Sequence, residues 1–220
     1  MLIFDNVTKR YHYEQYDTIS GLTLTLSDKL NTLLIDTQSG KTTLCKLVLG
    51  LEKPTNGSIY YNGVDVCTIE PKQLDATYLC KELLLFDGKT ALYNVAKPLL
   101  LRGYSKQDAA AKATQALAQV GVDANAKVSK LCVEDKVGVV LARLFARGSS
   151  MVLVDDFLPL LTPVQTQQLM GYLTNANCFV LHLTSQPDLV FGKVYLWHDG
   201  KIVTDNITQV LQQALWLNKY

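Results

Sequence analysis

Alternating apolar and polar residues predict β-hairpins in the first third of this chain. Residues 2–7 (LIFDNV) and 22–26 (LTLTL) repeat with the period of two expected of half-buried strands, and a polar, tyrosine-rich stretch separates them. Residues 58–61 continue this pattern and are followed by Asn62-Gly63, a dipeptide that favours a tight hairpin turn. The N-terminal region is therefore predicted to form an antiparallel β subdomain.

Helical spacing of apolar residues dominates the middle of the chain. Residues 42–49 form a short predicted helix, and the pattern stays helical from about 90 to 146. Residues 105–108 (SKQD) resemble a capping box at the start of a helix that ends before Gly121. Residues 207–217 predict a closing helix.

Short, continuous apolar runs predict strands that are buried on both faces. They occur at residues 33–35, 151–154 and 179–183, and such runs are typical of parallel sheets. A last hairpin is expected within residues 194–203. These elements together predict an α/β fold with a helical insert.

Composition excludes several classes of protein. With 220 residues and 48% hydrophobic content, the chain can form one sizeable domain with a true core. Its 21 basic and 20 acidic residues balance, so nothing indicates a nucleic-acid partner. Five scattered cysteines favour a reducing compartment over disulfides or a zinc site. No apolar run approaches the ~18 residues of a membrane span, so we expect a soluble, cytoplasmic chain.

The segment Ser39-Gly40-Lys41-Thr42-Thr43 has the composition of a phosphate-binding loop. It lies between a predicted strand and a predicted helix, where backbone N–H groups and the helix dipole attract phosphate. In such loops the lysine reaches the β- and γ-phosphates and the first hydroxyl residue is a Mg²⁺ ligand. A Gly-Lys-Thr tripeptide also occurs in ordinary surface turns, which is the alternative interpretation.

Asp155 and Asp156 follow the buried run MVLV about a hundred residues downstream. An acidic residue at the end of such a strand is the expected second half of a nucleotide site, where it holds the metal through water. The alternative is a polar cap where the strand leaves the core. We predict Asp155 as the metal residue, together with Thr42.

Nearly the whole chain resembles the nucleotide-binding domain of the ATP-binding cassette (ABC) family. The resemblance is carried by several separated blocks in the family's order. These are LVLGLEKPTNGSIYYNGVDV, LLLFDGKTALYNVAKPLLLRGYSKQDAAAKATQALAQVGV, LARLFARGSSMVLVDD and LWHDGKIV. It implies a P-loop NTPase cassette fold with a mainly parallel core sheet, an N-terminal antiparallel β subdomain and a helical insert. It also implies a single domain over residues 1–220 with a helical subdomain at about 82–145.

The resemblance assigns further residues of the nucleotide site. It implies ATP and Mg²⁺ as ligands, bound by residues 39–43 and Asp155. Tyr11 takes the position of an aromatic residue that stacks on adenine; Tyr13 and Tyr16 are nearby rivals, and an ordinary half-buried tyrosine at a strand end is the alternative.

Several positions depart from the family pattern within the same site. Ile35 and Gln38 replace glycines of the phosphate loop, and an isoleucine cannot adopt a positive φ cheaply. Asp156 stands where the family has a catalytic glutamate, and Ser185 where it has the switch histidine. His182 lies three residues before Ser185 and is not expected to replace that histidine. We expect very weak or absent hydrolysis.

Other departures lie outside the phosphate loop. Lys81 replaces the glutamine that touches the metal, and Thr162 replaces an aspartate of the family's D-loop. Residues 131–135 (LCVED) take the place of the Leu-Ser-Gly-Gly-Gln signature that faces the nucleotide of a second cassette. Two carboxylates there oppose binding of a polyphosphate. A homodimer would therefore lack a proper signature.

Two functions are consistent with the sequence. The first is an ATP-binding subunit of an ABC transporter, peripheral at the inner face of the cell membrane through transmembrane permease subunits and paired with a second, catalytically intact cassette. The second is a non-transport interaction or regulatory module that uses nucleotide structurally. The apolar run at residues 83–86 (LLLF) is interpreted as core, with a docking surface as the alternative.

Overall fold

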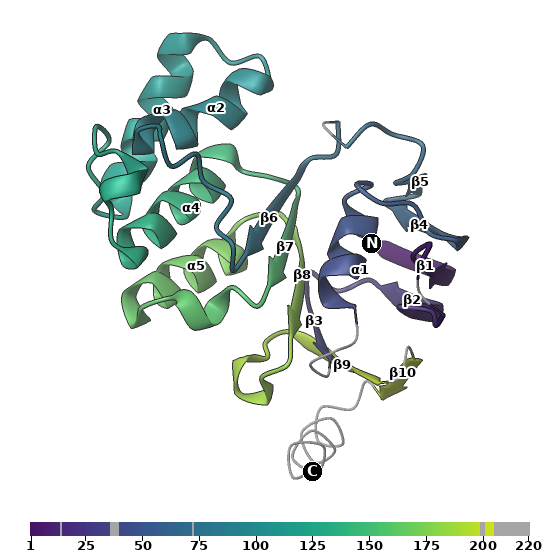
Figure 1. The fold of residues 1–220 in the computed structure, drawn as a ribbon. Coiled ribbons are helices and arrows are strands. Elements are labelled where there is room, and N and C mark those ends of the chain that lie inside the picture. Colours follow the sequence, from purple (N-terminus) through teal and green to yellow (C-terminus); the bar gives the residue numbers. More distant parts are fainter. Residues whose placement is uncertain (14, 36–39, 72, 199–200, 205–220) are drawn as a thin grey trace. The chain divides into compact units, whose positions relative to one another are not determined.

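The computed structural model describes residues 1–13, 15–35, 40–71, 73–198 and 201–204. Figure 1 labels its strands and helices along the chain. The strands are β1 Leu2–Lys9, β2 Ile19–Leu26, β3 Leu30–Ile35, β4 Asn56–Tyr61, β5 Val64–Asp65, β6 Ala76–Cys80, β7 Met151–Asp155, β8 Phe179–Thr184, β9 Lys193–His198 and β10 Lys201–Thr204. The helices are α1 Lys41–Val48, α2 Ala91–Leu101, α3 Lys106–Gln119, α4 Val133–Arg147 and α5 Pro163–Asn175, with 3-10 turns η1 Val128–Lys130, η2 Leu158–Leu160 and η3 Pro187–Leu189.

The described residues form two compact units, and the first contains both β-sheets. It comprises the described residues within 1–78, 151–156 and 178–204. The four-stranded sheet has the order β2-β1-β4-β5 and its pairs are antiparallel, which confirms the predicted N-terminal hairpins. The six-stranded sheet has the order β10-β9-β3-β8-β7-β6. Strands β3, β7 and β8 pair in parallel, as the buried apolar runs predict, and β9 also pairs in parallel with β3.

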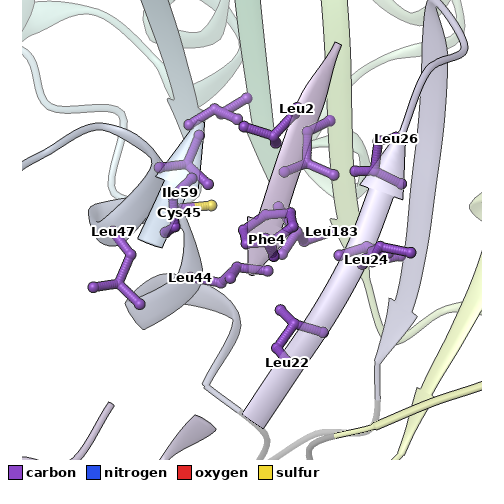
Figure 2. Close-up of a cluster of buried hydrophobic side chains, with 14 of the residues drawn as sticks. Leu2, Phe4, Leu22, Leu24, Leu26, Leu44, Cys45, Leu47, Ile59 and Leu183 are labelled. Atoms are coloured by element: carbon purple, nitrogen blue, oxygen red, sulfur yellow. The ribbon is translucent and has the colours of Figure 1, made fainter. Parts of the chain in front are cut away.

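Helix α1 packs into the apolar core of this unit. Its apolar side chains, Leu44, Cys45, Leu47 and Val48, are fully buried against residues of both sheets. Figure 2 shows Leu44 and Cys45 close to Phe4 of β1 and Leu183 of β8. Burying a leucine or valine side chain contributes about 1.5–3 kcal/mol, so this packing holds α1 against the two sheets.

The second unit contains helices α2 to α5 and comprises residues 79–150 and 157–177. Alanines at the contacts between α2, α3 and α4 allow the helix axes to approach closely. Ser105 caps α3 by accepting a 3.0 Å hydrogen bond from the Asp108 N–H, as the sequence predicts. The helix ends at Gln119, and Gly121 follows with φ 74°.

Two expectations on local structure have different outcomes. The last hairpin is confirmed, because β9 and β10 pair in an antiparallel manner, although its turn at Asp199-Gly200 lies outside the described residues. The predicted helix at residues 207–217 also lies outside them. Within the described part of the chain, no helix is both long and apolar enough to cross a bilayer.

Candidate functional site

The start of α1 is fixed by a glycine that no other residue can easily replace. Gly40 precedes the helix with φ 79°, and a Cβ atom at this position would lie 2.9 Å from Thr18 Cγ2 and 3.1 Å from the Thr18 carbonyl oxygen. Left-handed backbone is cheap only for glycine. Ser39, a predicted ligand residue, lies outside the described residues, as does Gln38.

Ile35 causes no backbone strain at this junction. It is the last residue of β3, pairs with Trp197 of β9 and is buried in the core. The expected conflict between a β-branched side chain and a left-handed backbone therefore does not arise, because Ile35 belongs to the strand rather than to a tight loop.

Lys41, the first residue of α1, forms an ion pair with Asp156. The Lys41 ammonium lies 3.1 Å from Asp156 Oδ2, and the two side chains are 11% and 27% exposed. Asp156 follows β7 with a φ of 46°, which is uncommon for a residue other than glycine. Both residues are predicted from the sequence for one site, and the structure brings them into contact.

Asp155 accepts two hydrogen bonds on a single carboxylate oxygen. The Thr42 hydroxyl donates to Oδ2 over 3.0 Å, and the Tyr78 hydroxyl donates to the same atom over 2.7 Å. Asp155 is nearly buried at the end of β7. Thr42 and Asp155, the two predicted metal residues, thus lie together. Sequence reasoning missed Tyr78, which carries no motif and reaches the site only because β6 joins the same sheet.

Tyr11 lies beside α1. Its hydroxyl is 3.2 Å from the Thr43 hydroxyl, and the ammonium of Lys9 lies 4.9 Å from the centre of its ring. The rival tyrosines, Tyr13 and Tyr16, are 97% and 81% exposed. Only Tyr11 is thus placed next to the predicted phosphate-binding residues by a contact that the structure describes.

Ser185 and His182 lie on or just after β8. Ser185 is partly exposed directly after the strand, whereas His182 is fully buried within it. The His182 ring stacks on Phe191 with centroids 4.7 Å apart, and its Nδ1 lies 3.3 Å from Thr32 Oγ1. Burial lowers the pKa of His182 to about 3, so the ring stays neutral. A histidine packed in this way belongs to the core of the sheet.

Residues 131–135, in the second unit, form the start of α4. Cys132 caps this helix, since its Sγ accepts a 3.4 Å hydrogen bond from the Asp135 N–H. Glu134 and Asp135 lie in the first turn, where carboxylates stabilise the helix dipole. Lys81 is exposed just after β6, and Thr162 caps α5 together with Gln165.

The apolar run at residues 83–86 is not the core segment that the sequence favoured. Leu84 and Phe86 are 57% and 55% exposed, while Leu85 packs on the core of the second unit. Leu83 and Leu84 both have left-handed backbone, with φ of 59° and 46°. The core interpretation is therefore wrong for Leu84 and Phe86.

Several known proteins are similar to this chain in sequence. The sequence model of the ABC transporter family matches residues 20–158. The chain is similar to the methionine import ATP-binding protein MetN of Caulobacter vibrioides, with 29% identity over 224 residues, or 95% of this chain and 68% of that protein. MetN 3 of Oceanobacillus iheyensis, also a methionine import ATP-binding protein, is 27% identical over 220 residues, or 92% of this chain and 64% of that one. This chain spans only about two thirds of their length.

A solved structure resembles the fold as well. It is a dimeric ATP-binding cassette in a post-hydrolysis state bound to ADP and phosphate, with a TM-score of 0.81 and 21% identity, and the match covers 93% of this chain and 97% of that one. At this identity the likeness concerns the fold, and it confirms the predicted P-loop NTPase cassette architecture.

Proposed function

Because this chain belongs to the ABC transporter family, we propose that it is the ATP-binding subunit of a transporter, which retains Mg-ATP binding but hydrolyses ATP very slowly or not at all. The observation that carries the proposal is the contact of Lys41 with Asp156 and of Thr42 with Asp155 at the start of α1. Residues 1–220 are proposed to act as one nucleotide-binding domain that includes both compact units.

The residues at the start of α1 fit a polyphosphate. Gly40 adds no side chain at the N-terminus of the helix, and the first N–H groups of a helix attract anions. Lys41 already holds a carboxylate oxygen of Asp156, which is an acceptor of the same kind as a phosphate oxygen. Nucleotide binding requires Lys41 to exchange Asp156 for phosphate.

The donor set around Asp155 fits a hard cation. Thr42 and Asp155 offer only oxygen atoms, as Mg²⁺ prefers, and they already lie 3.0 Å apart. Bound Mg²⁺ neutralises phosphate charge. To engage the metal, the Thr42 hydroxyl has to turn away from Asp155, which would hold the ion through water.

The same geometry argues against efficient hydrolysis. A general base must reach the attacking water, but Asp156 is one methylene shorter than glutamate and its carboxylate is paired with Lys41. A misplacement of about 1 Å can cost on the order of 10²-fold in rate. Ser185 offers no imidazole near the γ-phosphate, and lost electrostatic stabilisation of this type costs roughly 10²- to 10³-fold.

The exposed apolar side chains of the second unit support docking to a partner. Leu84, Phe86 and Tyr93 all lie on the surface, and Phe86 and Tyr93 contact each other edge to face. Grouped apolar exposure of this kind is typical of interaction sites. We propose that the partners are transmembrane permease subunits and a second, intact cassette, which would hold this chain at the inner face of the membrane. Co-purification with a membrane protein tests this part.

Thermal unfolding with and without Mg-ATP tests nucleotide binding. A ligand that binds only the folded chain stabilises it by about 2.7 kcal/mol at a hundredfold excess over its dissociation constant. We expect an upward shift in the wild-type chain and in Lys46→Ala, an exposed lysine in the last turn of α1, but no shift in Lys41→Ala. If Mg-ATP leaves the melting temperature of the wild-type chain unchanged, the proposed nucleotide binding is wrong.

A further inference from the structure

Lys9 is a nearly buried lysine without a role in the proposed phosphate or metal site. It is the last residue of β1, is 9% exposed, and donates hydrogen bonds to Glu52 Oε2 over 3.0 Å and to the Lys53 carbonyl oxygen over 2.9 Å. Burying a lysine is costly unless it is paired. These hydrogen bonds explain how a buried ammonium group is tolerated. They do not explain why a lysine occupies this position.

The position of the ammonium places it over an aromatic ring. Lys9 Nζ lies 4.9 Å from the centre of the Tyr11 ring, within the range of a cation–π interaction. The same ammonium donates to Glu52 and to the Lys53 carbonyl oxygen, both in the segment that follows α1. The cation therefore cannot move away from the ring without breaking two hydrogen bonds.

The same ring is also held at its hydroxyl end. Tyr11 Oη lies 3.2 Å from the Thr43 hydroxyl, two residues beyond Lys41. Two contacts, one over the ring face and one at its tip, thus fix Tyr11 relative to the start of α1. The ring is still partly exposed.

We propose that Lys9 is a positioning residue that holds Tyr11 as the stacking platform for the base of the nucleotide. The inference rests on the proposed function. A cation over one face leaves the opposite face for the base, and it withdraws electron density from the ring, which reduces repulsion between two stacked π systems. Lys9 does not touch the nucleotide and acts through Tyr11.

Two ligands distinguish an effect on the base from an effect on the phosphates. ATP engages both parts of the site, whereas inorganic tripolyphosphate engages only the phosphate part. Isothermal titration of the full chain with each ligand gives two dissociation constants. Lys9→Met, which keeps the length of the side chain but not its charge, should weaken ATP binding about threefold to tenfold and leave tripolyphosphate binding unchanged.

Neighbouring residues provide matched controls. Arg10→Met removes a cation from the adjacent position, where Arg10 pairs with Asp17 and is half exposed, and it should change neither constant. Lys9→Arg keeps a cation beside the ring and should bind ATP more tightly than Lys9→Met. If Lys9→Met does not fold, Glu52→Gln loosens the same ammonium and should show the same selective loss for ATP.

Several outcomes would overturn this role. Equal weakening of both ligands in Lys9→Met would show that the lysine supports the phosphate site or the fold in general. An unchanged ATP constant would show that the platform does not need the cation. If wild-type protein binds tripolyphosphate as tightly as ATP, the base contributes no affinity and only the role of Tyr11 as a stacking platform is contradicted. If wild-type protein binds neither ligand, the proposed function is contradicted, and the role of Tyr11 with it.

Discussion

Asp156 holds the ammonium of Lys41 at 3.1 Å, and it does so from a left-handed backbone conformation. The carboxylate thus lies where the phosphates of a nucleotide are expected. In the proposed function this internal ion pair competes with the nucleotide for the same lysine, which leads to the first prediction.

Asp156→Asn should tighten nucleotide binding. Partly exposed ion pairs contribute about 0–1 kcal/mol, so releasing Lys41 should lower the dissociation constant for ATP by up to about fivefold. Isothermal titration measures the change. Asp17→Asn, which breaks the surface pair with Arg10, is the control and should have no effect. Weaker binding in Asp156→Asn would mean that the carboxylate assists the ligand instead of competing with it.

Asp156→Glu alone should not restore ATP hydrolysis. The longer side chain restores the family's residue type, but Ser185 and the LCVED segment at residues 131–135 stay unchanged. Defects in residues that act as one unit do not add independently, so repairing one leaves the rate low. Phosphate release by the purified variant is the measurement. Turnover near ~1 s⁻¹ that disappears in Lys41→Ala would contradict the prediction.

Tyr78→Phe should lower the concentration of Mg²⁺ that ATP binding requires. Asp155 Oδ2 accepts hydrogen bonds from both Tyr78 and Thr42, and engaging a hydrated metal requires these bonds to rearrange. Removing one donor lowers that cost, so half-maximal thermal stabilisation by ATP should need less Mg²⁺. Tyr60→Phe on β4 removes a hydroxyl elsewhere and serves as the control. A Mg²⁺ requirement that increases in Tyr78→Phe would show that Tyr78 orients Asp155 for the metal.

Because of His182, the free energy of unfolding should be lower at acidic pH than at neutral pH. Its pKa is lowered to about 3 in the folded chain from an ordinary value near 6.5, so the unfolded state binds more protons below pH 6.5. The contribution of His182 to the free energy of unfolding is complete above that pH. It decreases by about 2 kcal/mol between pH 7.5 and pH 5.

Urea unfolding at several pH values tests the assignment to His182. His182→Gln lowers stability at neutral pH but should show a shallower loss between pH 7.5 and pH 5 than the wild type. His12→Gln, which replaces an exposed histidine next to Tyr13, is the matched control variant. Equal slopes in His182→Gln and wild type would assign the acid sensitivity to other groups.

ATP should not drive homodimer formation. Glu134 and Asp135 lie in the first turn of α4, in the segment that by resemblance faces the nucleotide of a partner cassette. Negative charge next to a γ-phosphate is repulsive, with about 4 kcal/mol at 4 Å in a medium of effective dielectric 20 as an upper guide. Size-exclusion chromatography should give the same elution volume with and without Mg-ATP. A nucleotide-dependent dimer would show that the carboxylates turn away from the interface.

Local patterns predicted most of the fold because their causes are local. The cap at Ser105 depends on a residue three positions away, and the hairpin at β4 and β5 depends on Asn62-Gly63. The run at residues 83–86 failed because apolar composition alone does not report backbone handedness. With left-handed φ at Leu83 and Leu84, side chains of one continuous run point in different directions.

Contacts across long separations account for what was missed at the site. Phosphate-loop residues carry a motif, so Lys41, Thr42 and Asp155 could be placed together from the sequence. Tyr78 lies 77 residues from Asp155, and Lys9 lies 43 residues from Glu52. No spacing rule connects such pairs, because only strand order and packing bring them into contact.

Helix α5 was also not predicted, since its apolar spacing is weak, although Thr162, Pro163 and Gln165 form a recognisable helix start.

The central place of β3 in its sheet has a consequence for the chain during synthesis. Both neighbours of β3 come from the last quarter of the sequence. Thr32 therefore cannot contact His182 until 150 further residues have been synthesised. At about 5–20 residues per second, a ribosome needs on the order of 10 s to deliver that partner. Until then both edges of β3 are unpaired. The strand that leads to the predicted phosphate loop is thus among the first segments synthesised but among the last to be incorporated into its sheet.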